Sequence, residues 1–380
     1  MRTLDSTPAA DGFRMPAEWE RHDGCWMVWP QNGYVWREGA RPAQRALACL
    51  ANAVVDSGED VTVTVTGDQY AHARSSLDSR VRVVEATSRL GWARDIAPTF
   101  VVDNSCRRRG VDFAFNGYGN RYPYWATDDQ YARKVLDLAA TDRYRAPAVL
   151  EGGAFHVDGQ GTALVTAETL LDPARNDSPS RAAMEELLTS YLGVTRTLWI
   201  EWGLTQDATR GHVDNMACFA APGLICLTWT DDTRDPQYDR SARALEELRD
   251  ATDAQGRTLR VEKLPLPGPL HATDDEVRGV DSHVPRAKGP QLPRLTASYA
   301  NFYLTADHLF APLLDPERDD EALARLARIF PQHTVVGIPT RELLLGGGNI
   351  HCATQQMPSR RSGEANPPTV DAARRRLGHS

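Results

Sequence analysis

The runs TALVT (162–166) and TLWIE (197–201) flank the longer segment SRAAMEELLTSYLG (180–193). The two short runs are rich in β-branched and apolar residues, as buried strands are. The longer segment starts at a serine and repeats apolar residues at spacings of three and four, which predicts an amphipathic helix. A helix between two strands is typical of α/β proteins.

The same alternation continues through the chain. Further strand-like runs are VTVTVT (61–66), VRVVEA (81–86), TFVVD (99–103), VDFAFN (111–116) and TVVGI (334–338). Further helical segments are DDQYARKVLDLAA (128–140), YDRSARALEELRDA (238–251) and DDEALARLARIF (319–330). These patterns predict an α/β fold throughout.

No boundary divides these units, so we predict one catalytic domain over residues 15–357. We expect residues 1–14 to be flexible and the Arg- and Pro-rich tail, 358–380, to be disordered. Residues 265–294 are rich in Pro and Gly, which indicates a long loop. A loop of this length is either a lid over a site or disordered, and the sequence does not choose between the two.

Composition limits the classes of function. The longest apolar stretch, 217–229, is interrupted by Pro and Gly and is shorter than the ~20 residues of a membrane span, and the N-terminus has no apolar secretory segment. We therefore expect a cytoplasmic protein without a membrane partner. The net charge of -8 disfavours a nucleic-acid partner and favours a cationic small molecule. The six cysteines form no CxxC pair, so neither a disulfide framework nor a zinc finger is expected.

Two segments place reactive side chains beside glycines or strands. In GGGNIHCATQQ (346–356), three glycines free the backbone just before Cys352. An inert buried cysteine is the alternative interpretation, which the polar residues after Cys352 disfavour. In GHVDN (211–215), His212 and Asp214 are two residues apart, so they point to the same face of an extended strand. The alternative is a solvated surface pair, which the apolar strand that follows disfavours.

Two more carboxylates stand next to strands. Asp95 follows Trp92 and Arg94, and a carboxylate beside an indole can hold a flat cation by charge and stacking. An ion pair with Arg94 is an equally good interpretation of Asp95. Glu151, before two glycines, is a candidate supporting residue. A cysteine with distant histidine and acidic residues suits nucleophilic catalysis, but it suits a cysteine protease, an amidase or a transglutaminase as well.

Seven collinear motifs together resemble one family. They are MPAEWERHDGCWMVWP (15–30), WARDIAPTFVV (92–102), LEGGAFHVDGQGT (150–162), GHVDNMACFAAPG (211–223), WTDD with DPQY (229–238), ASYANFY (297–303) and LLGGGNIHCATQQMP (344–358). The chain is similar to agmatine deiminases over nearly its whole length. This resemblance implies the pentein fold, a five-bladed pseudo-symmetric α/β propeller with a central active site.

The resemblance also implies the site. The matching motifs give Cys352, His212, Asp95 and Asp214 as catalytic residues. A guanidinium is a flat cation that carboxylates bind bidentately, so the two aspartates are expected to clamp it while the cysteine attacks its central carbon. Added substrate-binding candidates are Trp92, Glu151, Arg210 and Gly348. No metal and no cofactor is expected, and a homodimer is compatible with the family.

One departure from the family concerns the substrate. Family members often carry DETNGH before the histidine, whereas this chain has DATRGH (207–212), with Ala208 and Arg210 at the changed positions. Agmatine carries a second positive charge, which this change disfavours if both positions face the ligand. The expected reaction is deimination of agmatine or of a guanidino compound with a neutral or anionic group, partnered in that case by Arg210. An amidinotransferase that uses the same cysteine and histidine is the remaining alternative.

Overall fold

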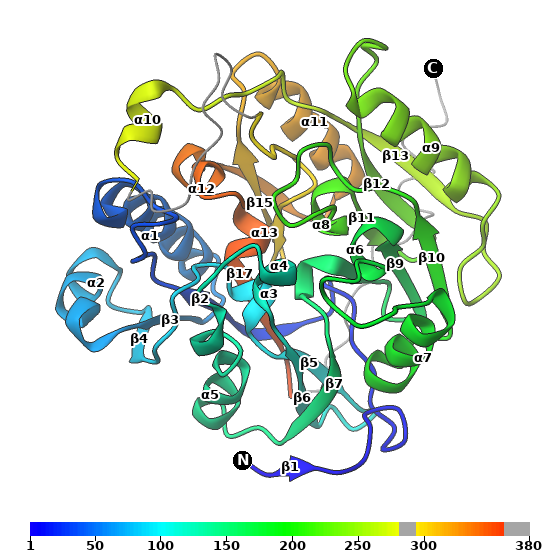
Figure 1. Ribbon diagram of the computed structural model, residues 1–380, viewed down its shortest axis with the longest axis horizontal. Helices are drawn as coiled ribbons and strands as arrows, with labels where there is room; N and C mark the ends of the chain where they lie inside the picture. The colour runs from blue at the N-terminus through cyan, green and yellow to red at the C-terminus, as the bar shows by residue number, and fades with distance from the viewer. Residues whose placement is uncertain (281–293, 361–380) are drawn as a thin grey trace.

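A computed structural model of the chain describes residues 1–280 and 294–360. Within these ranges the strands form five separate sheets of three or four strands (Figure 1). Long helices lie around the outside, and several short helical turns lie near the middle. No helix in the described ranges is long and apolar enough to cross a membrane.

All five sheets contain the same arrangement of three strands. The first strand is antiparallel to the second, and the second is parallel to the third. A parallel connection needs a crossover, and a helix provides it each time. Four units follow this order: β5 (Thr99–Val102), β6 (Arg108–Ala114), α5 (Tyr131–Leu138) and β7 (Arg143–Val149); β8 (Phe155–Val157), β9 (Thr162–Thr166), α7 (Arg181–Leu192) and β10 (Arg196–Ile200); β11 (Ala217–Ala221), β12 (Leu224–Trp229), α9 (Gln237–Arg249) and β13 (Arg260–Pro265); β14 (Tyr303–Leu304), β15 (His308–Leu313), α11 (Asp319–Ile329) and β16 (Thr334–Pro339).

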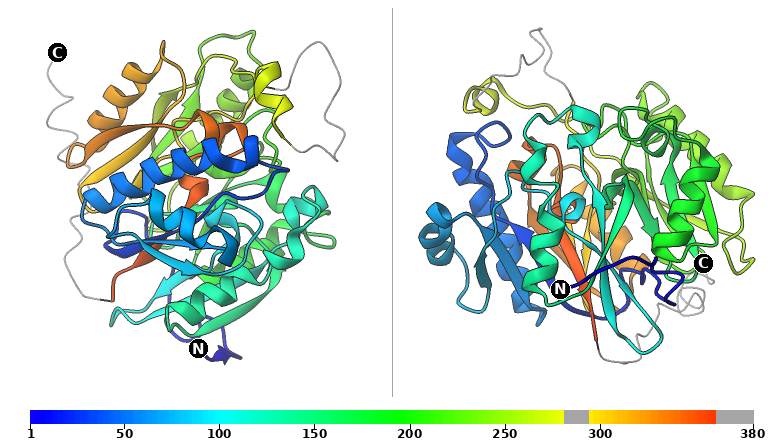
Figure 2. Two further views of the ribbon diagram at one scale, coloured as in Figure 1. Left: turned by 90° about the vertical axis from the view of Figure 1, so that its left-hand side faces the viewer. Right: turned by 60° about the horizontal axis from the view of Figure 1, so that its bottom comes forward.

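The fifth sheet joins the two ends of the chain. Its strands and helices are β2 (His22–Val28), α1 (Arg41–Asp56), β3 (Val61–Val65), α2 (Tyr70–Ser76), β4 (Arg82–Glu85) and, as the strand antiparallel to β2, β17 (Thr354–Pro358). Helix α1 also contacts α12 (Arg341–Leu345), which comes from near the other end of the chain (Figure 2). The last strand among the described residues therefore completes the first sheet.

Four short helical turns each stand directly before the first strand of a sheet. They are α3 (Ala93–Ile96), η4 (Gly152–Ala154), α8 (Val213–Met216) and α13 (Ile350–Ala353). Figure 1 shows α3, α8 and α13 in the middle of the molecule, with α1, α5, α7, α9 and α11 around them. The remaining short elements are η1 (Glu38–Ala40), η2 (Gly67–Gln69), α4 (Gly117–Asn120), η3 (Trp125–Thr127), α6 (Ala167–Leu170) and α10 (Asp274–Arg278).

Local sequence explains where the elements begin and end. Helix α7 begins after Ser180, whose side chain accepts the N–H of Ala183, and ends at Gly193, which has a φ of 71°. The apolar stretch 217–229 forms two strands because Gly223, with a φ of 73°, turns the chain between them. The seven strand-like runs and four helical segments that we identified each overlap a strand or helix of the structure.

The N-terminal segment differs from our expectation. Residues 1–14, expected to be flexible, are packed: β1 (Thr3–Leu4) pairs with β7, and Phe13 is buried beside Tyr144. The lower edge of the molecule in Figure 2 shows this dark blue segment. Apolar packing and ion pairs that involve arginines hold this segment against the rest of the protein. The composition of residues 1–14 alone does not predict these contacts. Most of the tail and residues 281–293 of the long loop lie outside the described residues.

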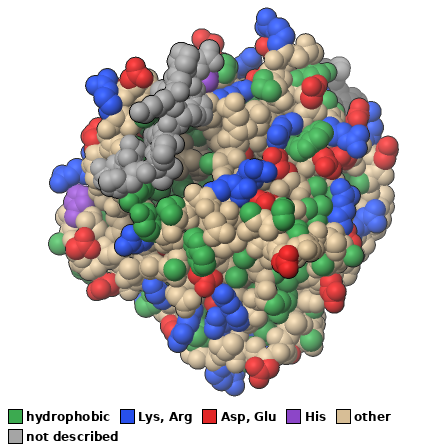
Figure 3. All heavy atoms as spheres, viewed as in Figure 1, with side chains coloured by type: hydrophobic (Ala, Val, Ile, Leu, Met, Phe, Trp, Pro, Cys, Tyr) green, Lys and Arg blue, Asp and Glu red, His purple; other side chains and the backbone are tan. Residues whose placement is uncertain are grey.

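The surface carries charges of both signs. On the face seen in Figure 3, acidic and basic side chains are interspersed, and neither sign forms a continuous patch. Elsewhere as well as here, charged side chains form ion pairs, and Arg243 with Glu247 and Arg325 with Glu321 are examples. Pairs of this kind contribute little to stability.

Candidate active site

The short turns in the middle of the molecule bring five reactive side chains together. Helix α13 contacts α3, α3 contacts η4, and η4 contacts α8. These turns and the residues that cap them carry Cys352, Asp95, Glu151, His212 and Asp214. Each turn ends where a strand begins, so the sheets fix its position. The sheets therefore hold in one place side chains that are far apart in the sequence.

Cys352 lies in a nearly closed environment, with 6% of the residue exposed. The side chain of Asn301 donates a hydrogen bond to its Sγ at 3.2 Å, and the thiol donates to Asp214 Oδ2 at 3.5 Å. Burial, together with the charges of Asp214 and Asp95, raises the pKa of the Cys352 thiol well above its usual range. The cysteine is thus a protonated thiol in the ligand-free protein.

His212 stands between two acidic side chains. Its Nδ1 is 3.7 Å from Asp95 Oδ1, and its Nε2 is 3.6 Å from Glu151 Oε2. Burial alone would lower the pKa of His212, but the carboxylates of Asp95 and Glu151 outweigh burial and raise it to about 9. Around neutral pH the side chain is therefore an imidazolium that can donate a proton.

Asp95 and Asp214 border a space that Gly153 keeps open. A Cβ atom on Gly153 would lie 2.6 Å from His212 Nδ1, 2.9 Å from Asp214 Oδ2 and 3.0 Å from Asp95 Oδ1. Asp95 accepts hydrogen bonds from the Tyr118 hydroxyl at 2.8 Å and from the Gly153 N–H at 3.0 Å. Burial raises the pKa of Asp95 to about 6, although His212 opposes this rise. The two carboxylates thus face the same small space.

Glu151 has a partner that the sequence did not reveal. The Nε of Arg175 lies 3.0 Å from both of its carboxylate oxygens. Burial raises the pKa of Glu151, but Arg175 and His212 overcome burial and lower it to about 2. Glu151 is therefore a permanent negative charge that faces His212.

Trp92 and Gly348 form the wall beside the thiol. A Cβ atom on Gly348 would lie 3.0 Å from the Cβ of Cys352 and 3.0 Å from two ring carbons of Trp92. The ring of Trp92 packs on Trp36, with ring centroids 5.1 Å apart. The glycine thus lets an aromatic ring approach the thiol closely, and this ring can stack on a flat cation.

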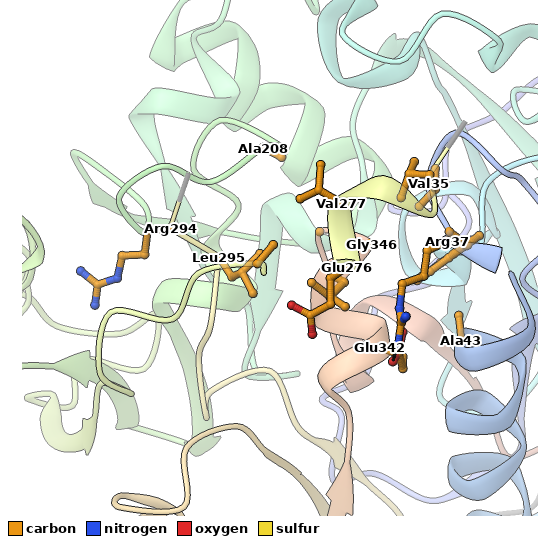
Figure 4. A pocket seen from close by; sticks show the side chains of 15 residues that line it. Val35, Arg37, Ala43, Ala208, Glu276, Val277, Arg294, Leu295, Glu342 and Gly346 are labelled. Carbon is orange, nitrogen blue, oxygen red and sulfur yellow. Dashed lines mark hydrogen bonds and ion pairs between the residues drawn. The ribbon is translucent and has the colours of Figure 1, made fainter. Parts of the chain in front are cut away.

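A cavity of about 330 Å³ adjoins this wall. Trp36, Gly346 and Gly347 line its inner part, and Ala208 is also among its lining residues. Figure 4 shows Ala208 and Arg294 on one side of the cavity, with Val35, Arg37 and Ala43 on the other. The charged lining side chains are in ion pairs: Arg37 with Glu342 at 2.6 Å, Glu276 with Arg341 at 2.8 Å and Arg294 with Asp235 at 2.8 Å.

Comparisons with known proteins agree with this arrangement. A profile of the Porphyromonas-type peptidyl-arginine deiminases matches residues 14–358. This chain belongs to that family. It is 49% identical to an agmatine deiminase of Pseudomonas aeruginosa over 369 residues, 95% of this chain and 100% of the relative. An agmatine deiminase of Pseudomonas putida is 47% identical over 94% of this chain and 99% of its own length.

The three-dimensional fold also matches that of solved agmatine deiminase structures. The solved structure of the agmatine deiminase of Enterococcus faecalis superimposes with a TM-score of 0.89 at 38% identity, over 95% of this chain and 100% of that one. Like it, this deiminase-family chain has an α/β pentein fold. Family membership makes the chain a hydrolase that acts on the carbon–nitrogen bonds of a guanidine.

The structure brings together most of the family residues that the sequence identified. Cys352, His212, Asp95, Asp214 and Glu151 meet in one place, and Trp92 and Gly348 adjoin them. Arg210 lies apart from them: it is exposed and is not among the residues that line the cavity.

Sequence reasoning missed four neighbours of the site. Asn301 and Glu18 fall within motifs that carried the family resemblance, which was the available signal for them. Tyr118 and Arg175 lie outside those motifs, and only the folded chain brings them to the carboxylates of Asp95 and Glu151.

A second buried cluster, made of potential metal ligands, lies next to the active-site residues. Glu18, His156 and His351 place one potential ligand atom each within 4.8 Å of one another, as a metal site would. Glu18, however, already pairs with Arg94 at 3.1 Å. The guanidinium of Arg94 opposes a divalent metal ion at this carboxylate.

The protonated thiol predicts a selective alkylation pattern. At pH 7 we expect neutral iodoacetamide to modify the exposed Cys49 faster than Cys352, because the thiolate is the reactive form. The cationic reagent 2-chloroacetamidine should reverse this preference, since its charge favours the Cys352 thiolate. Peptide mass spectrometry over time measures both rates. Equal rates for the two cysteines with iodoacetamide would contradict a protonated Cys352.

The open space at Gly153 predicts a severe effect of one methyl group. In Gly153→Ala the new Cβ would enter the space between His212, Asp95 and Asp214, so ammonia release from a guanidine should fall ~100-fold or more. Gly268→Ala is the matched control, because its Cβ would meet only Asp315, at 3.2 Å. Near-normal activity of Gly153→Ala would show that the substrate does not use this space.

Proposed function

We propose that this protein hydrolyses agmatine to N-carbamoylputrescine and ammonia, with Cys352 as the nucleophile. One observation carries the proposal: the imidazolium of His212 and two carboxylates lie around the space at Gly153, and the Cys352 thiol donates a hydrogen bond to one of those carboxylates. The names of the relatives from Pseudomonas aeruginosa and Pseudomonas putida support agmatine as the substrate.

Substrate binding uses the two aspartates. A guanidinium presents its N–H groups in a plane, and carboxylates accept them with charge-assisted hydrogen bonds. Asp95 and Asp214, which both border the space at Gly153, accept them, and the buried Asp214 Oδ1 has no hydrogen-bond partner among the described residues. The ring of Trp92 stacks on the cation, and Gly348 leaves room for the ring beside the thiol.

The first half of the reaction forms a covalent intermediate. The positive charge of the bound substrate favours loss of the Cys352 proton to solvent, and the thiolate attacks the central guanidinium carbon. A carbon–sulfur bond forms, and the tetrahedral adduct then loses one nitrogen. His212 gives its proton to that nitrogen, ammonia leaves, and Cys352 carries an S-alkylthiouronium.

The second half consumes one water. His212, now neutral, takes a proton from this water, and the resulting hydroxide attacks the thiouronium carbon. The carbon–sulfur bond breaks, the hydroxyl proton of the adduct passes to the departing Cys352 sulfur and restores the thiol, and a ureido product forms. Glu151, held by Arg175, stabilises the imidazolium each time that it forms.

The cavity that would receive the end of the substrate away from the guanidine supports a second class of substrate. Ala208 lines the cavity, and the charged lining side chains that we identified already have partners. This lining favours a guanidino compound whose far end is neutral or anionic. Arg210 is exposed, so a role for it as an anion partner requires a ligand that reaches past Ala208.

Four further proposals concern the propeller fold, the domain bounds, the location and the oligomeric state of the protein. The repeated strand order in five sheets supports a five-bladed pseudo-symmetric propeller. We propose residues 15–357 as its single catalytic domain. Six unpaired cysteines fit a cytoplasmic location. We also propose a homodimer, which light scattering on the purified protein would test.

The decisive experiment measures products from purified protein. We expect ammonia and a ureido compound from agmatine, no turnover by Cys352→Ala, and a ~10²–10⁴-fold slower reaction by His212→Ala. The chelator EDTA should leave the rate unchanged. Guanidino acids and neutral alkylguanidines form the comparison panel, and faster turnover of one of these would replace agmatine as the substrate. Amidino transfer to an added amine without ammonia release would identify an amidinotransferase.

The pKa values predict a bell-shaped pH profile. Asp95 must be ionised to bind the cation, so kcat/KM should fall as the pH falls through about 6. His212 must be protonated to release ammonia, so kcat/KM should also fall as the pH rises through about 9. Tyr118→Phe removes a hydrogen bond that lowers the pKa of Asp95, so the acidic limb should move to higher pH.

A buried tyrosine elsewhere provides the control for this shift. Tyr131 pairs with Thr64 away from the site, and Tyr131→Phe should leave both limbs in place. An acidic limb that is identical in wild type and Tyr118→Phe would remove Asp95 as its source.

A further inference from the structure

A chain of buried charges connects Glu18 to the nucleophile. Glu18 Oε1 lies 2.8 Å from His351 Nε2, and His351 Nδ1 lies 2.9 Å from Asp214 Oδ2. The same oxygen of Asp214 accepts the Cys352 thiol at 3.5 Å. The side chains of Glu18, His351 and Asp214 are each no more than 6% exposed. The steps proposed above use neither Glu18 nor His351.

Geometry defines the protonation of His351. Both of its ring nitrogens face carboxylates, and a neutral imidazole has an N–H on only one of them. Both hydrogen bonds therefore require an imidazolium. Burial and Arg94 lower the pKa of His351, but Glu18 and Asp214 overcome both and raise it.

His156 also contacts Glu18, but its protonation state differs from that of His351. Its Nδ1 accepts the backbone N–H of Phe219 at 3.3 Å, so its Nε2 carries the proton and faces Glu18 Oε2 at 3.4 Å. A neutral ring satisfies both contacts. No hydrogen bond or ion pair links His156 to Asp214 or Cys352 among the described residues. It therefore shares the burial of His351 but not its link to the site.

The two oxygens of Asp214 have different surroundings. Oδ2 is held by His351 and the Cys352 thiol, whereas Oδ1 is buried and has no hydrogen-bond partner among the described residues. An unpaired buried carboxylate oxygen is costly unless a ligand provides a donor. The division leaves Oδ1 as the oxygen available to a substrate N–H.

We propose that His351, anchored by Glu18, is a positioning residue that holds Asp214 by Oδ2 so that Oδ1 receives the guanidinium. This inference rests on the proposed function, because it assigns Oδ1 to the substrate of that reaction. His351 acts through Asp214 and does not touch the substrate itself. Its positive charge also keeps Asp214 ionised among the other acidic groups of the site.

Several groups set the ionisation of Asp214. The titratable and charged groups that face it from the packed elements are His351 and Cys352 of α13, His212 before α8, Arg94 and Asp95 of α3, Cys218 of β11 and Asp207 of the preceding loop. Burial raises the pKa of Asp214, but the hydrogen bond and charge of His351 outweigh burial and lower it. Loss of His351 should therefore raise this pKa.

The test compares three variants. His351→Leu should raise KM for agmatine about tenfold or more, the range expected for a lost charge-assisted hydrogen bond, and should move the acidic limb of kcat/KM to higher pH. His351→Asn keeps a donor near the position of Nδ1 and should recover part of the KM loss. His156→Leu removes a similar buried ring from the same Glu18 and should leave KM and the acidic limb within about threefold of wild type.

A second readout does not depend on turnover. Labelling of Cys352 by 2-chloroacetamidine should slow in His351→Leu but not in His156→Leu, while labelling of Cys49 by iodoacetamide stays constant. Wild-type KM, pH limb and labelling in His351→Leu would overturn the inference, as would equal losses in both leucine variants. Absence of ammonia release by wild type would overturn the proposed function alone, since labelling still distinguishes the variants.

Discussion

The site depends on negative charge that is buried with too few cations to balance it. Asp95 and Asp214 lie beside one space, and His212 is the cation nearest to it. Carboxylates in such surroundings lose the solvation of water and gain little from screening. A planar cation from the substrate restores the balance, and its charge simultaneously favours the thiolate of Cys352. Binding and activation of the nucleophile thus follow from one electrostatic imbalance.

The fold holds these buried negative charges close together. Each of α3, η4, α8 and α13 leads directly into a strand, so backbone hydrogen bonds of four sheets hold the turns that carry the charges. Repulsion between Asp95 and Asp214 can therefore not be relieved by moving the backbone apart. Beside them, Arg175 pairs with Glu151, and His351 pairs with one oxygen of Asp214. Support of this kind keeps reactive groups in place before the substrate arrives.

Sequence reasoning succeeded where the signal is local. Segments such as 180–193 carry their own periodicity and capping residues, and the structure confirms the helix there. The pairing order of the sheets has no such local signal, because β17 joins β2 across the whole chain. For the same reason Tyr118, Arg175 and the link between Glu18 and His351 could not be predicted: their partners are set by tertiary packing. The family motifs located Cys352 but not the contacts that tune it.

The pairing of β17 with β2 has a consequence for how the protein is made. During synthesis the ribosome releases β2 long before β17, so one edge of the first sheet waits without its neighbour until residues 354–358 have been made. Cys352 lies on the turn just ahead of β17 and arrives with that final strand. A growing chain therefore possesses the acidic residues and the histidine before it possesses the thiol. Covalent chemistry begins only when the segment that carries Cys352 has joined the sheet of β2.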